Sequence, residues 1–144
     1  MRTVLFDIDH TLADAAWRDP LLGEPWDRYH APAYLDAPIP HMVALCRSIK
    51  TSFTITGITL RPEKWRAMTT KWLSRNEIPI DELLMRPDQC TLSAASCKLA
   101  LAVLRFRPVH RHVEFIVDND ESIIDAFQGI GVPALHARTR CLQR

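Results

Sequence analysis

The sequence predicts an α/β fold of three layers, in which helices cover both faces of a mostly parallel five-stranded sheet. Short apolar runs alternate along the chain with longer segments whose apolar residues recur at helical spacing. The chain has 144 residues, of which 47% are hydrophobic, so it can bury the core of one compact domain. We therefore expect a single domain over residues 1–144, with an insert at residues 13–40.

Each element in the first half follows from its local pattern. The first strand begins at Thr3 and is an apolar run that ends in acidic residues. Residues 13–40 hold half of the ten prolines, so we expect no long helix there, but either a lid or an ordered surface loop. Residues 41–50 have apolar side chains at helical spacing, and residues 52–56 are a strand that Gly57 is expected to end.

The second half continues the alternation. A helix is expected over residues 62–75, where a proline stands near the start and tryptophans share one stripe. Five further elements are expected after it: a strand at 83–85, a helix at 93–105, a strand at 113–117, a helix at 122–128 and an edge strand at 132–136.

Composition argues against several classes of protein. The formal net charge is +1, so no overall field marks a nucleic-acid-binding protein. The four cysteines form no Cys-x-x-Cys pair, so we expect no zinc site and reduced thiols in a cytoplasmic protein. We expect neither a signal peptide nor membrane association, because no apolar run approaches the about 20 residues of a membrane span.

The strongest chemical signal lies where the first strand ends. Asp7, Asp9 and Thr11 follow the apolar run at alternate positions. Open α/β sheets build their ligand sites in such loops. One carboxylate can attack phosphorus to give an acyl-phosphate, while a second gives a proton to the leaving oxygen. The alternative is an Asp-rich turn after a strand.

Three weaker signals follow in the chain. The Thr56 hydroxyl and the backbone at Gly57 suit a phosphate oxygen, although Thr-Gly is also an ordinary turn. Lys98 is the one lysine of an otherwise apolar helix, where it either clamps Asp7 to a phosphate or is exposed. Asp118 follows the fourth strand and either binds Mg²⁺, which prefers oxygen ligands, or caps the next helix. Their joint order favours a phosphate site.

The Asp7-x-Asp9-x-Thr11 element resembles the first motif of the haloacid dehalogenase-like (HAD) phosphohydrolases. The resemblance implies their Rossmann-like fold, with Asp7 as the nucleophile, Asp9 as the general acid/base and Thr11 at the substrate. Asp118 would bind Mg²⁺ together with Asp7, the carbonyl of Asp9 and Asn119.

The resemblance also assigns the remaining members of the catalytic set. Thr56 and Lys98 would complete it, and Gly57 would contact the phosphate.

Longer segments resemble the phosphatase domain of polynucleotide kinase/phosphatases and their stand-alone phage relatives. The segments include Trp26-Asp27-x-Tyr29, Trp65 to Leu73, Leu84 to Pro87, Val117 to Asn119 and Phe127 to Val132. The sequence has no kinase-type phosphate loop, so the resemblance concerns the phosphatase half. It implies that the substrate is a phosphorylated small molecule such as a nucleotide, or a nucleic-acid 3′-phosphate end.

The sequence departs from that family at several positions. His10 stands where glycine is usual and must accept a tight backbone, where it adds a phosphate contact or hinders the loop. Ile58 stands where the arginine of Thr-Gly-Arg is usual, and we expect Arg61 to replace that arginine at the substrate. Asn119 stands where a second acid is common. These departures support a rival hypothesis, a weakly active or inactive module that binds phosphate and regulates.

Substrate choice is expected to lie in the insert. Trp26 and Tyr29 either stack on a base of the substrate or fasten the loop. A basic group of side chains either follows a nucleic-acid backbone or is a solvated surface. Its members are Arg105, Arg107, His110, Arg111, His112 and, toward the C-terminus, Arg138, Arg140 and Arg144.

Overall fold

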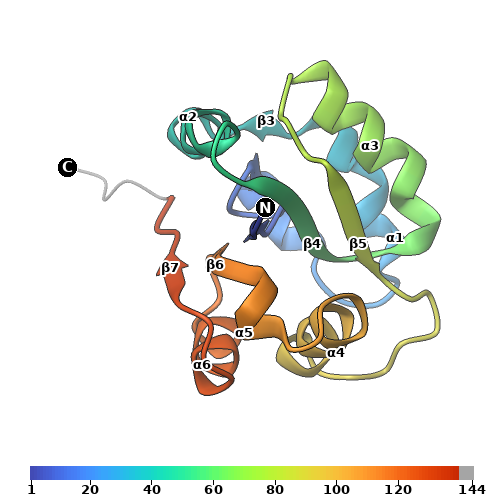
Figure 1. The fold of residues 1–144 in the computed structure, drawn as a ribbon. Coiled ribbons are helices and arrows are strands. Elements are labelled where there is room, and N and C mark those ends of the chain that lie inside the picture. Colours follow the sequence, from blue (N-terminus) through green and yellow to red (C-terminus); the bar gives the residue numbers. More distant parts are fainter. Residues whose placement is uncertain (140–144) are drawn as a thin grey trace.

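The structure is a computed structural model that describes residues 1–139, and its main sheet is parallel, as predicted (Figure 1). The strand order is β5–β4–β1–β6–β7, and every neighbouring pair is parallel. The strands are β1 (Thr3–Phe6), β4 (Thr54–Pro62), β5 (Glu82–Arg86), β6 (Val113–Asp118) and β7 (Ala134–His136). Because β1 is central, its carboxyl end lies between those of β4 and β6, where open sheets bind ligands.

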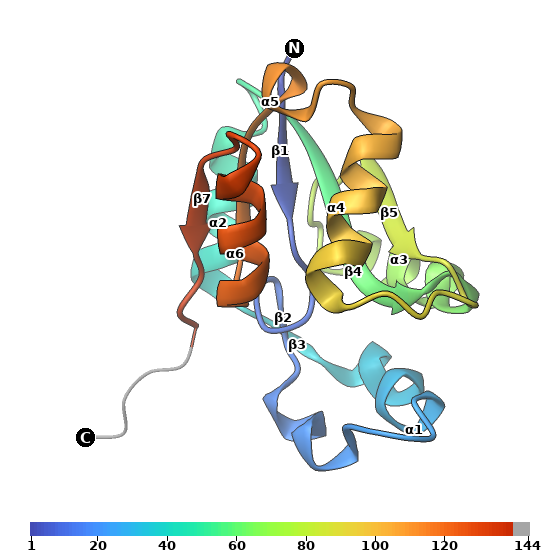
Figure 2. The same ribbon diagram turned by 90° about the horizontal axis from the view of Figure 1, so that it is seen from below.

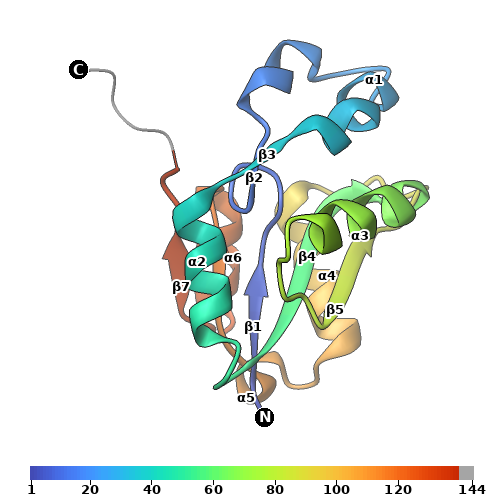
Figure 3. The same ribbon diagram turned by 90° about the horizontal axis from the view of Figure 1, so that it is seen from above.

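Helices cover both faces of the sheet, so the three-layer prediction is confirmed (Figures 1 and 3). On one face lie α2 (Pro40–Ile49) and α3 (Arg66–Arg75), the latter preceded by the 3-10 turn η3 (Glu63–Trp65). On the other lie α4 (Ala94–Arg105) and α6 (Glu121–Gly129), and the single turn α5 (Val109–His112) leads into β6. None of the helices within residues 1–139 is long and apolar enough to cross a membrane.

The side chains of β1 point alternately to the two faces of the sheet, so they belong to two separate parts of the core. Val4 and Phe6 pack into the cluster that contains Trp72 of α3, whereas Leu5 packs into the cluster that contains Phe127 of α6. Both faces of β1 are therefore buried, which explains why its sequence is a continuous apolar run.

The insert lies beyond the carboxyl end of the sheet (Figure 2). Its elements are β2 (Ala13–Asp14), η1 (Ala16–Leu21), α1 (Asp27–His30), η2 (Ala31–Leu35) and β3 (Ala37–Pro38). β2 and β3 pair antiparallel, with Ala13 opposite Pro38, and close the base of the insert. Within this described segment every helix is short, as its prolines predict.

The predicted end of the second strand at Gly57 is wrong, because β4 continues to Pro62. Gly57 pairs with Phe6 on one side and with Leu83 on the other, in the middle of the sheet. A Cβ at Gly57 would lie 2.8 Å from Cδ1 of Leu83. The glycine therefore allows close packing within a buried strand and does not mark a turn.

Candidate active site

Two carboxylates meet at the carboxyl ends of neighbouring strands. Asp7 directly follows β1, and its backbone N–H donates to the carbonyl of Val117 in β6 at 3.0 Å. Asp118 is the last residue of β6. Both side chains are buried. The parallel register of β1 and β6 therefore brings Asp7 and Asp118 to one point, as the sequence predicts.

Lys98 joins the two carboxylates. Its Nζ donates to Oδ1 of Asp7 at 2.7 Å and to Oδ2 of Asp118 at 2.6 Å. Lys98 is only 1% exposed, so the alternative of a surface lysine is excluded. The Thr11 hydroxyl donates to the second oxygen of Asp7 at 2.9 Å. These contacts fix the orientation of the Asp7 carboxylate.

Burial and neighbouring charges shift the pKa values of Asp7 and Lys98. Burial and the neighbouring Asp118 raise the pKa of Asp7 to about 7, although Lys98 acts to lower it. Burial alone would lower the pKa of Lys98, but Asp118 and Asp7 hold it above its ordinary value. When both carboxylates are ionised, one ammonium group neutralises only one of their two charges.

This donor set fits Mg²⁺. No group of three His, Cys, Asp or Glu side chains that could hold a metal occurs in the described part of the chain. Mg²⁺ does not need one, since it takes one or two carboxylates and completes its shell with waters and phosphate oxygens. Asp7 and Asp118 supply hard oxygens with uncompensated charge. The metal roles of Asp7, Asp9, Asp118 and Asn119 stay predictions.

Asp118 does not cap the following helix. Asp120 is the N-cap of α6, and its Oδ1 accepts from the backbone N–H of Ser122 at 2.8 Å. The backbone N–H of Asp120 in turn donates to Oδ1 of Asp118 at 3.0 Å. The carbonyl of Asn119 accepts from Nε2 of His136 at 3.0 Å. The capping alternative for Asp118 is therefore wrong.

Two buried arginines hold Asp9. Arg61 donates to Oδ1 of Asp9 from Nη2 at 2.7 Å and from Nε at 3.2 Å. Arg18 donates to the same oxygen from Nη2 at 2.8 Å. Burial acts to raise the pKa of Asp9, but Arg61 and Arg18 outweigh it and hold this pKa well below its ordinary value. Asp9 is therefore ionised at neutral pH.

Asp36 completes this group, which we call the arginine cluster (Asp9, Arg18, Asp36 and Arg61). Its carboxylate accepts from Nε of Arg18 at 2.9 Å and from Nη2 at 2.7 Å, and it lies 3.5 Å from Nη2 of Arg61. Two carboxylates thus balance two guanidinium groups. Asp9 comes from the loop that follows β1 (the catalytic loop), Arg18 and Asp36 come from the insert, and Arg61 comes from β4. Neither Arg18 nor Asp36 is predicted from the sequence to lie at the site.

The structure contradicts the predicted place of Thr56 and Gly57 in the site. The Thr56 hydroxyl is 2.8 Å from that of Thr3, at the beginning of β1. Thr59 instead lies near the end of β4, is buried, and accepts from the backbone N–H of Arg61 at 3.1 Å. The spacing Thr59-Leu60-Arg61 fits the family's Thr-Gly-Arg with leucine in place of glycine, and this signal was present in the sequence.

His10 adopts the backbone that its position requires. Its φ is 65°, in the left-handed region where glycine is favoured, which confirms the predicted tight backbone. Its Nε2 lies 3.2 Å from Oδ1 of Asp19, in the insert. A phosphate contact of His10 stays a prediction.

Trp26 and Tyr29, the two aromatic residues of the insert that were predicted to stack on a base, differ in exposure. Tyr29 is 6% exposed, with the Arg18 guanidinium 4.5 Å from the centre of its ring. It therefore fastens the insert and has no open face for a base. Trp26 is 44% exposed and keeps such a face.

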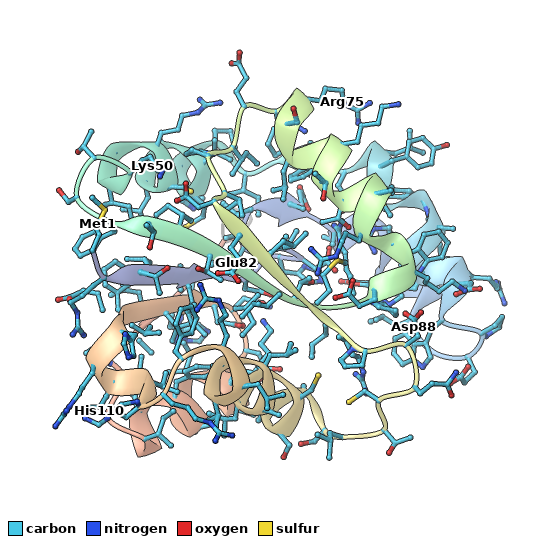
Figure 4. The ribbon with its side chains drawn as sticks, turned by 45° about the vertical axis from the view of Figure 1, so that its right-hand side comes forward. Met1, Lys50, Arg75, Glu82, Asp88 and His110 are labelled. Carbon is cyan, nitrogen blue, oxygen red and sulfur yellow. The ribbon has the colours of Figure 1, made fainter. Side chains whose placement is uncertain are left out.

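Of the predicted basic group, Arg138 lines a pocket with His10 and Asn119, whereas the members on and before α5 lie away from the site. His110 and its neighbours on α5 directly precede β6, so they lie at the amino-terminal edge of the sheet. Figure 4 shows His110 far from Asp88, which lies beside the insert. Arg105 is paired with Glu82, with 2.6 Å between Nε and Oε1. Arg140 and Arg144 lie outside the described residues.

The sequence profile of a family described as "Polynucleotide kinase PNKP phosphatase domain" matches residues 1–139. The chain belongs to this family. It is a phosphatase domain with the HAD fold, as the resemblance of its motifs implies. No curated protein matches the phosphatase domain.

Solved structures share the fold of the phosphatase domain. A chain of the Pnkp1/Rnl/Hen1 RNA repair complex has a TM-score of 0.81 and 22% identity, with 94% of this chain and 42% of that chain covered. A predicted phosphatase from Clostridium acetobutylicum has a TM-score of 0.72 and 15% identity, with 94% and 83% covered. A HAD family enzyme from Bacteroides thetaiotaomicron, in complex with magnesium and inorganic phosphate, has a TM-score of 0.62 and 9% identity, with 96% and 95% covered. The phosphatase domain thus spans less than half of the Pnkp1-complex chain.

Proposed function

We propose that this domain is a Mg²⁺-dependent phosphomonoesterase that acts through an aspartyl-phosphate, on nucleotides or on nucleic-acid 3′-phosphate ends. The observation that carries the proposal is the Asp7 carboxylate, which is buried, oriented by Lys98 and Thr11, and adjacent to Asp118. A nucleophile fixed in this way needs little reorganisation to attack phosphorus.

The residues of the site account for each step. An oxygen of Asp7 forms a bond to phosphorus as the bond from phosphorus to the leaving oxygen breaks, and the leaving oxygen takes up a proton. Water then attacks the aspartyl-phosphate, which releases inorganic phosphate and restores Asp7. Lys98 neutralises charge that the phosphate brings. Mg²⁺ bound by Asp7 and Asp118 would neutralise phosphate oxygens as well.

Asp9 is suited to move the proton only after its arginines loosen. In the arginine cluster it is ionised and therefore accepts a proton more readily than it gives one. A phosphate dianion competes with Asp9 for Arg61, because guanidinium groups bind phosphate through paired hydrogen bonds. Substrate binding would thus raise the pKa of Asp9 and prepare it as an acid.

Arg61→Lys is expected to raise KM for an aryl phosphate about tenfold, because lysine cannot replace the paired contacts of a guanidinium. Steady-state kinetics and the inhibition constant of inorganic phosphate measure the effect. Arg66→Lys is the matched control, because Arg66 forms an exposed pair with Glu63 in the same region. Unchanged KM for the Arg61 variant would show that Arg61 does not bind the phosphate.

The metal requirement gives the main test of the proposed function. We expect the domain to hydrolyse a chromogenic aryl phosphate in the presence of Mg²⁺ and to lose this activity in excess chelator. Protons compete with the cation for Asp7, whose pKa is raised to about 7, so more Mg²⁺ should be needed at pH 6 than at pH 8. Asp118→Asn should increase the Mg²⁺ concentration needed for activity at both pH values. Asp125→Asn, on the exposed face of α6, should leave it unchanged. Full activity in chelator would exclude the metal role.

The substrate class is supported by the family and by the exposed ring of Trp26. A base stacked on an aromatic side chain contributes about 1–3 kcal/mol. Trp26→Ala is therefore expected to lower kcat/KM for a 3′-phosphorylated oligonucleotide about tenfold and to leave an aryl phosphate unaffected. Trp26→Phe, which keeps a ring, should retain most of the activity. Equal losses on both substrates would mean that Trp26 only supports the insert.

The rival function, a module that binds phosphate with little turnover, has one observation in its favour. Asp9 is tied to two arginines, and a carboxylate held in this way is a poor acid. Calorimetric binding of inorganic phosphate without hydrolysis of any phosphomonoester would support the rival.

A further inference from the structure

His30 is a buried residue of the insert that the proposed chemistry does not use. It is the last residue of α1 and is 7% exposed. Its Nδ1 is buried and has no hydrogen-bond partner, a state shared within residues 1–139 only by Nε1 of Trp65. Buried polar atoms are nearly always paired, so an unpaired one calls for a ligand or a water.

The backbone of α1 ties His30 to the catalytic loop. Arg18 donates from Nη1 to the carbonyl of Tyr29, the residue before His30, at 2.9 Å. The same guanidinium donates from Nη2 to Oδ1 of Asp9 at 2.8 Å. One side chain therefore bridges the end of α1 and the carboxylate that is proposed to serve the leaving oxygen.

The imidazole is neutral and held in place by neighbouring rings. Burial lowers the pKa of His30 to about 4, against the opposing effect of Asp9. A neutral imidazole nitrogen donates to or accepts from a hydroxyl, depending on its tautomer. The ring centre lies 5.0 Å from that of Tyr29 and 6.3 Å from that of Trp26. His30 thus adjoins both the exposed indole and the group that contains Asp9.

We propose that Nδ1 of His30 binds the 2′-hydroxyl of a ribonucleotide whose 3′-phosphate is being removed, so that the domain prefers RNA ends to DNA ends. The inference rests on the proposed function, in which Asp9 serves the 3′ oxygen. The 2′-hydroxyl is on the carbon next to the one that bears this oxygen, and a base stacked on Trp26 would place the sugar between Trp26 and Asp9. DNA lacks this hydroxyl.

The experiment compares kcat/KM for 3′-phosphorylated RNA and DNA oligonucleotides of the same sequence, with an aryl phosphate as reference. The wild-type domain is expected to prefer RNA about tenfold, the size of effect that one buried hydrogen bond gives. His30→Phe keeps a ring against Tyr29 but has no nitrogen, so it should remove the preference by slowing RNA only. His30→Asn places a polar atom close to the position of Nδ1 and should keep part of it. His110→Phe, at the far edge of the sheet, is the control.

Three outcomes would overturn the inference. They are a wild-type domain without RNA preference, an equal loss on RNA and DNA in His30→Phe, and an RNA preference that survives this variant. If His30→Phe does not fold, the RNA-to-DNA ratio of His30→Gln, which lacks a polar atom at the position of Nδ1, decides. The aryl phosphate distinguishes a failure of the proposed function from a failure of the inference about His30. If the wild-type domain with Mg²⁺ does not hydrolyse the aryl phosphate, the proposed function is wrong. Binding of both oligonucleotides to Asp7→Asn, with and without His30→Phe, then still tests His30.

Discussion

Asp7→Asn is expected to lower kcat by about 10³-fold or more while the domain stays folded. Asparagine keeps the shape of the side chain and can still contact Thr11 and Lys98, but its amide cannot form the bond to phosphorus. Aryl phosphate hydrolysis measures the loss, and the midpoint of thermal unfolding shows whether the fold is kept. More than a tenth of the wild-type rate would exclude Asp7 as the nucleophile.

Asp125→Asn provides the control for Asp7, because it makes the same chemical change at an exposed position of α6. Beryllium fluoride gives a second, independent readout, since it mimics a phosphoryl group on a carboxylate. We expect it on an oxygen of Asp7 in a soaked crystal. Its attachment to Asp9 instead would reverse the two assigned roles.

Asp36→Ala is expected to lower the free energy of unfolding by about 3–5 kcal/mol, the usual effect of removing one partner from a buried ion pair. Arg18 and Arg61 are fully buried, and without Asp36 their two charges face only Asp9. Denaturant unfolding followed by circular dichroism measures the change. Activity should fall as well, because Asp36 and Arg18 hold the insert against the loop that carries Asp9.

Asp27→Ala is the matched control for Asp36. Asp27 also lies in the insert and is also paired, but its partner Lys64 and its own side chain are exposed. Exposed pairs contribute at most about 1 kcal/mol. Similar losses for the two variants would mean that the arginine cluster does not stabilise the insert.

The order of elements was predictable because each strand of a parallel sheet buried on both faces is an apolar run. The error at β4 has a physical cause. A glycine after an apolar run predicts the end of a strand, but Gly57 is buried between β1 and β5 and serves close packing. The sequence after it, Ile58-Thr59-Leu60, continues as strand. The placement of Thr56 at the site was wrong for the same reason.

The meeting of Asp7, Lys98 and Asp118 was also predictable. Carboxyl ends of neighbouring parallel strands share one edge, and a single lysine in an apolar helix has few ways to be buried other than beside carboxylates. Arg18 and Asp36 were not predictable. The insert has no helical or strand period that separates a buried face from an exposed one, and nothing in the sequence distinguishes its buried arginine from an exposed one such as Arg28.

The short β2–β3 pairing makes the insert resemble an exchangeable cassette. Its two ends lie opposite each other at Ala13 and Pro38, so a segment of different length could be grafted between them without moving β1 or α2. Arg18 and its partner Asp36 lie inside that cassette, yet Arg18 acts together with Arg61 of β4 to keep Asp9, outside the cassette, ionised. A transplanted insert that lacks this pair would bring a new specificity but would impair the chemistry. A change of insert therefore alters substrate range and catalytic activity at the same time.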